Sequence, residues 1–165
     1  MSLADALIAE LKQETAGTRK VLARVPDDKL GWRPHAKSMS LGELSYHIAV
    51  LPRAIANLLS ESAVEVPTPR LRADTPAADL VRMLDESVGV ATAKLAEWGD
   101  EGLRAPWSML RGGKVVLELP RSAGVRAIML NHWYHHRGQL TVYLRLLDVP
   151  LPALYGSSAD ERPFE

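Results

Sequence analysis

Three of the chain's five histidines, His132, His135 and His136, fall within five consecutive residues. On a helix, residues four apart leave the same face with their Cβ atoms about 5–6 Å apart, so the imidazoles of His132 and His136 can hold one metal ion. His135 competes with His136, because it lies three residues after His132 at the other edge of that face. We favour His136 because it continues the apolar row of its helix. That row includes Val125, Ile128, Leu140 and Tyr143.

A third imidazole is available from His47, which lies in a different predicted helix that begins at Ser40. Leu44 and Ile48 flank His47 on the apolar face of that helix, so its side chain should point inward. Three imidazoles with one open position are a usual ligand set for a catalytic metal ion. The histidine pattern therefore predicts a metal site made of His47, His132 and His136.

Three further residues are candidates for the surroundings of this ion. Glu43 lies one turn before His47 and can orient a ligand, although a role in capping its helix accounts for Glu43 on its own. Gln139 follows the histidine pair and can contact a bound ligand. His135 and Glu43 are candidates for a general base by proximity alone, and no catalytic group is assigned. Arg137 can bind a carboxylate between helices.

Composition excludes several other kinds of chemistry. Twenty Lys and Arg balance twenty Asp and Glu among 165 residues, so no net field attracts nucleic acid or an anionic membrane. The absence of cysteine excludes disulfides, thiolate metal sites and cysteine nucleophiles, and suits a reducing cytosol. The start, MSLADALIAELKQE, lacks the pattern of a secretory signal, and no segment is apolar for about 20 residues. We expect a cytoplasmic protein with no nucleic-acid or membrane partner.

Apolar residues at helical spacing predict three helices before the histidine pair. The first covers residues 2–25, and Ser2 with Asp5 has the spacing of a capping box. The second begins at Ser40, where Glu43 completes another capping box, and contains Pro52, which removes one backbone hydrogen bond and should bend the helix. The third follows Thr75-Pro76, with Thr75 as its cap, and is closed by Gly99.

A fourth helix is predicted over 122–148, and the chain is expected to form a single all-α domain, 1–165, of four-helix-bundle type. Residues 100–120 are expected to form a short hairpin through Gly112-Gly113, with an irregular loop as the alternative. The proline-rich tail, 149–165, is expected to lie as an extended strap or to be disordered near its end. Because the fourth helix is apolar nearly all round, we also expect a homodimer.

Two strings of residues resemble a known family. HWYHHRGQLTVYLRLLDVPLPALYG (132–156) and DDKLGWRPHAKSMSLGELSYHIA (27–49) are similar to the DinB-like superfamily of metal-dependent proteins, also called damage-inducible or YfiT-like. The family motif is a histidine, three residues and then His-Arg-Gly-Gln, matched here by His132 and by His136 to Gln139. His47 matches the family's third histidine, which lies shortly after the start of the second helix. The resemblance thus also selects His136 over His135.

The resemblance implies an up-down-down-up four-helix bundle that binds a divalent ion, such as nickel or zinc, through three histidines and often forms a homodimer. Some relatives are low-molecular-weight thiol transferases, and one is a mycothiol-dependent maleylpyruvate isomerase. Our leading hypothesis is a metal-dependent enzyme, a hydrolase or thiol transferase, that activates water or a small thiol cosubstrate toward a small-molecule substrate. The alternative is a non-catalytic bundle that binds a metal or small ligand in a stress response.

Overall fold

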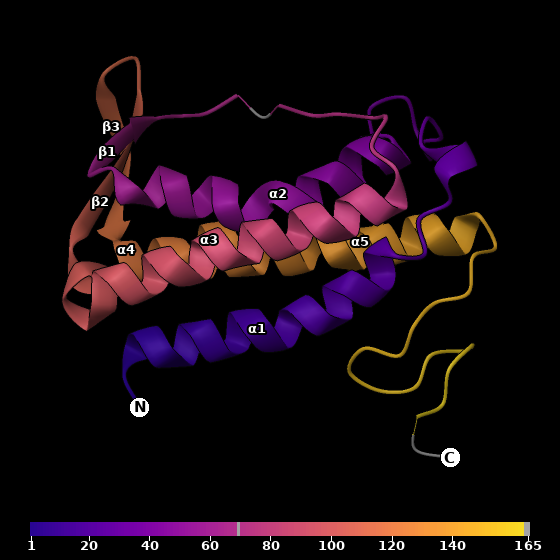
Figure 1. Ribbon diagram of the computed structural model, residues 1–165. Helices are drawn as coiled ribbons and strands as arrows, with labels where there is room; N and C mark the ends of the chain where they lie inside the picture. Colours follow the sequence, from indigo (N-terminus) through magenta and orange to yellow (C-terminus); the bar gives the residue numbers. More distant parts are fainter. Residues whose placement is uncertain (69, 164–165) are drawn as a thin grey trace.

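In the computed structural model, which describes residues 1–68 and 70–163, four long helices lie lengthwise against one another (Figure 1). They are α1 (Leu3–Leu22), α2 (Leu41–Ser60), α3 (Ala77–Arg104) and α5 (His132–Leu146). α2 and α3 run in the same direction, opposite to α1 and α5, so the expected up-down-down-up arrangement is present (Figure 1). A long connection crosses back along α2 before α3 begins, which makes the two middle helices parallel. None of the described helices has the length and apolar character needed to cross a membrane.

Of the three helix caps predicted from the sequence, two are confirmed as capping boxes. The Ser2 hydroxyl accepts the Asp5 N–H while the Asp5 carboxylate accepts the Ser2 N–H. Ser40 and Glu43 exchange the same pair of bonds at the start of α2, with 2.7 Å from the Ser40 N to the Glu43 carboxylate. These reciprocal bonds satisfy N–H groups that a helix end leaves without a partner.

The predicted cap of α3 was wrong. The helix begins at Ala77 after Pro76, and Thr75 makes no capping bond. The Ala77 N–H instead donates to the carboxylate of Asp27, at 2.8 Å, from the 3₁₀ turn η1 (Asp27–Lys29). A side chain fifty residues earlier thus replaces the local cap and fixes the start of α3 against the connection between α1 and α2.

The all-α expectation needs correction, because a small three-stranded sheet covers one end of the helices (Figure 1). The predicted hairpin is confirmed as β2 (Pro106–Arg111) and β3 (Lys114–Pro120), joined by Gly112 and Gly113 with φ angles of 58° and 74°. The strand that was not expected, β1 (Ala63–Glu65), pairs parallel with β2. Its Glu65 carboxylate accepts both glycine N–H groups of the turn, so β1 also holds the hairpin in place.

Two predicted helices are less regular than expected. Gly99 has the predicted positive φ, 54°, yet a further helical stretch continues from it to Arg104. The helix predicted over 122–148 is divided into α4 (Arg121–Gly124), a π-helical segment η2 (Val125–Asn131) and α5. The π-helix ends immediately before His132, and such wider turns are frequent at functional sites.

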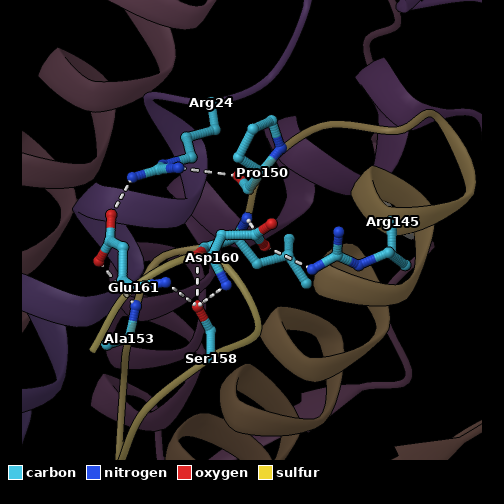
Figure 2. Close-up of polar contacts among 8 residues, drawn as sticks. Arg24, Arg145, Pro150, Ala153, Ser158, Asp160 and Glu161 are labelled. Atoms are coloured by element: carbon cyan, nitrogen blue, oxygen red, sulfur yellow. Dashed lines mark hydrogen bonds and ion pairs between the residues drawn. The ribbon is translucent and has the colours of Figure 1, made fainter.

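The described part of the C-terminal tail, 149–163, lies as the expected strap along α1 and the end of α5. Arg24, just after α1, donates to the Pro150 carbonyl and pairs with Glu161, and Arg145 of α5 pairs with Asp160 (Figure 2). Ser158 ties the strap to itself through bonds to backbone groups on both sides (Figure 2). The expectation of disorder at the very end falls on residues 164–165, outside the described residues.

Candidate metal centre

The structure brings His47, His132 and His136 together, with their Nε2 atoms facing one another. The Nε2 atoms of His132 and His136 are 2.8 Å apart, and those of His47 and His132 are 3.4 Å apart. One ring nitrogen from each histidine lies within 4.8 Å of the others, which is compact enough for one ion to reach all three. His47 comes from α2 and the other two from α5, so the cluster joins two helices of the bundle.

Two of the three imidazole rings have a hydrogen-bond acceptor at Nδ1, on the side away from the cluster. The Nδ1 of His136 lies 2.9 Å from the side-chain oxygen of Gln139, and the Nδ1 of His132 lies 3.3 Å from the Ile128 carbonyl in the π-helix. An acceptor at Nδ1 keeps the proton there and leaves the Nε2 lone pair directed at the centre. Metal-binding histidines are usually oriented in this way.

Burial keeps the cluster uncharged near neutral pH. Burial is the main cause that lowers the pKa of His47 to about 4, and the neighbouring His136 and His132 contribute to the same shift. Burial also lowers the pKa of His132 and His136, partly opposed by their bonds to Ile128 and Gln139. Imidazoles must be neutral to bind a metal, so the protein environment provides the form that a metal ion requires.

Pro52 helps to fix α5 against α2 beside the cluster. Because proline has no N–H, it leaves the carbonyl of Ile48, four residues earlier, without its helical partner. The buried indole of Trp133 donates to that carbonyl at 3.0 Å. The bond joins the residue after His47 to the residue after His132, and so sets the relative positions of two of the three histidines.

A buried ion pair fixes α5 on its other side. Arg137, directly after His136, donates to the Glu14 carboxylate of α1 at 2.6 Å, and the two side chains are only 4% and 10% exposed. The same guanidinium donates to the Glu14 carbonyl and to Thr18. Tyr155 of the strap contacts both partners. Arg137 therefore binds a carboxylate between helices, as the sequence indicated, and does not join the histidine cluster.

The remaining sequence candidates have different surroundings. Glu43 is engaged in the helix cap and lies 3.6 Å from Arg33. His135 is exposed, although its ring contacts that of His136 with 5.0 Å between the centroids. Of the three residues considered for the surroundings of an ion, only Gln139 bonds a histidine of the cluster.

A pocket of about 450 Å³ opens beside His47 and His132 and is lined mainly by apolar residues. Its lining includes Arg53 and Arg70, which the sequence reasoning missed. A signal for Arg53 was present, because it is the only charged residue in α2 after the capping Glu43. Arg70 lies in the irregular connection before α3, where no period indicates which way a side chain points.

Comparison with known proteins shows similarity over nearly the whole chain. Residues 1–162 match the model of the DinB family. The uncharacterized protein YrdA of Bacillus subtilis strain 168 is 23% identical over 162 residues, which cover 95% of this chain and 90% of YrdA.

Two solved structures share the fold. A DinB-like protein from Bacillus cereus ATCC 10987 superposes with a TM-score of 0.73 at 22% identity, covering 92% of this chain and 97% of the other. The DinB-like protein YjoA of Bacillus subtilis gives 0.67 at 21% identity, covering 90% and 96%. At these identities the likeness concerns the fold alone.

Proposed function

The chain belongs to the DinB family, and on this premise we propose that it is a metal-dependent enzyme whose divalent ion is held by His47, His132 and His136. The observation that carries the proposal is the convergence of three Nε2 atoms, with an acceptor behind two of the rings. A polar cluster without an ion would place uncharged nitrogen lone pairs against one another. Three imidazole donors suit several divalent ions. The family resemblance favours zinc and nickel, which are the ions we expect first.

A divalent ion held by these three histidines would supply Lewis acidity, which would lower the pKa of a water molecule or small thiol bound to it. The reaction is then hydrolysis, or transfer of a small thiol to an electrophile. Because the chain has no cysteine, the sulfur for thiol transfer comes from a cosubstrate. The chain's own contribution is to hold the rings of His132 and His136 through Ile128 and Gln139, and to hold an apolar substrate away from water in the adjoining pocket.

The test of metal binding uses protein purified without a histidine tag, stripped with chelator and titrated with zinc or nickel. We expect one ion per chain, and no ion at this site in His136→Ala. His35→Ala is the matched control, because His35 lies in an exposed loop and its Nδ1 accepts the Lys37 N–H. Equal metal content in wild type and His136→Ala would contradict the metal site.

The test of catalysis follows with the loaded protein, which is incubated with small thiols and electrophiles and with ester and amide substrates. Turnover that is lost in His136→Ala and kept in His35→Ala supports the enzyme. Tight ligand binding with no turnover of any of these compounds would favour the non-catalytic binding protein instead.

A further inference from the structure

The pocket beside the histidine cluster has walls that suit an apolar ligand. Its volume of about 450 Å³ lies within the range of small-molecule sites. The apolar part of its lining comes mainly from α2, β2 and η2. It includes Val50, Ile55, Leu58, Met109 and Ile128. His47 and His132 form the end of the pocket that meets the cluster.

The charged lining of the pocket is entirely positive. Arg53 and Arg70 line it, and no acidic side chain does so among the residues that the structure describes. Neither guanidinium has an ion-pair partner within 1–68 and 70–163, whereas arginines elsewhere, such as Arg82 and Arg126, pair with carboxylates. Two unpaired cations beside an apolar surface attract an anionic group.

Arg53 is half-buried in α2. It is the only charged residue of this helix after Glu43. Its backbone N–H, next to Pro52, donates to Ser87 of α3 at 2.8 Å, which fixes the backbone from which the side chain extends. Arg53 follows His47 by six residues, or about 9 Å along the helix axis, so one small ligand can contact both.

We propose that this pocket binds a small organic acid, in which a carboxylate contacts Arg53 and Arg70 and an apolar body extends toward the histidine cluster. The assignment of this acid as the substrate rests on the proposed function, because it names the substrate class of the same metal site. A carboxylate fits better than a phosphate, because the two arginines are accompanied by apolar walls instead of the polar cradle that a dianion requires.

The test measures binding to chelator-treated protein, so that a carboxylate cannot be held by a metal. The probes are octanoate and octanamide, which share an apolar chain and differ in charge. Binding is followed by calorimetry. We expect octanoate to bind about ten-fold more tightly or better, because a charged hydrogen bond contributes more than a neutral one.

Three variants locate the effect. Arg53→Gln and Arg70→Gln should each remove most of the preference for octanoate, and Arg53→Lys should retain part of it. Arg104→Gln is the control, since Arg104 lies on α3 with its side chain 73% exposed and does not line the pocket. All four variants are checked for native circular dichroism.

Equal binding of octanoate and octanamide, or an unchanged preference in both glutamine variants, would overturn the proposal. This result is independent of the metal titration described above. A protein that binds one ion but does not prefer octanoate would retain the proposed function and lose only the substrate class. A protein that prefers octanoate but binds no ion would retain the acid-binding pocket without the metal chemistry.

Discussion

Replacement of Glu14 by glutamine should destabilise the protein by about 3 kcal/mol, because it leaves Arg137 charged in the interior without its carboxylate. Removing one partner of a buried ion pair typically costs about 3–5 kcal/mol. We expect the lower end of that range, since Arg137 keeps its bonds to the Glu14 carbonyl at 3.0 Å and to Thr18 at 3.2 Å. For a domain of this size, the melting temperature should fall by roughly 6–12 °C.

The assay is urea unfolding of chelator-treated wild type, Glu14→Gln, Arg137→Met and the double variant. Because the double variant removes both charges, it should lose at least about 2 kcal/mol less than the two single losses added together. Glu10→Gln is the control. Glu10 also joins α1 to a later helix, through Arg126 of η2, but the side chains of this pair are 33% (Glu10) and 45% (Arg126) exposed. That variant should lose about 1 kcal/mol or less.

Two results would refute this reasoning. One is a loss in Glu14→Gln no greater than that in Glu10→Gln, which would mean that burial does not distinguish the two pairs. The other is additivity of the Glu14 and Arg137 variants, which would mean that the two side chains do not depend on each other.

Three further predictions follow from other parts of the molecule. Bonds from Arg126 and Tyr134 hold the pKa of Glu10 below 4.5. The contribution of Glu10 to stability is therefore complete above pH 4.5 and is lost as the pH falls through the lower pKa of the folded state. Below pH 4.5, the stability of Glu10→Gln, measured by urea unfolding, should fall less steeply than that of wild type. Gly42→Ala should cost about 2 kcal/mol in urea unfolding, because its Cβ would lie 2.2 Å from a backbone oxygen. Gly89→Ala, inside α3 with open space around it, should instead stabilise the protein by up to about 1 kcal/mol. We propose that Val142 and Leu146, which are 57% and 59% exposed on α5, lie in a dimer interface. Light scattering should then show a dimer that Val142→Glu dissociates. A wild-type monomer at micromolar concentration would contradict the dimer.

Features that depend on neighbouring residues were predictable from the sequence. The capping boxes of Ser2 and Ser40 are complete within four residues each, and the turn at Gly112-Gly113 needs only residues that tolerate positive φ. The cap of α3 was not predictable in this way, because the acceptor belongs to Asp27, fifty residues away. A local pattern cannot indicate that a distant side chain has displaced the local cap.

The same distinction applies to β1 and the π-helix. β1 has three residues, too few to display an alternating pattern, and it exists because Ala63 to Glu65 pair with β2 more than forty residues later. The π-helix η2 has only seven residues. Over so short a segment its apolar spacing is the same as that of an α-helix, so the sequence pattern cannot distinguish the two. Both features depend on packing between distant parts of the chain.

For the candidate site, periodicity placed each histidine on the inward face of its own helix, but it could not show that the two faces meet. The histidine pattern suggested that set and the family resemblance agreed with it, and the structure places the three rings together. Periodicity also missed the pocket, since Arg53 and Arg70 come from a helix and an irregular connection that share no local pattern. Arg53 was nevertheless detectable as the only charged residue of α2 after Glu43.

Pro52 illustrates how a locally unfavourable residue can serve the geometry of the site. Within α2 it removes a hydrogen bond, and a proline inside a helix typically costs about 3 kcal/mol. The Ile48 carbonyl that it leaves free accepts the Trp133 indole N–H, so part of that cost is offset by a bond between helices. Because Ile48 follows His47 and Trp133 follows His132, a shift of either helix by one residue would break this bond and separate the rings. The proline thus makes one register of α2 and α5 more stable than its neighbours, and it is the register in which the histidine nitrogens meet.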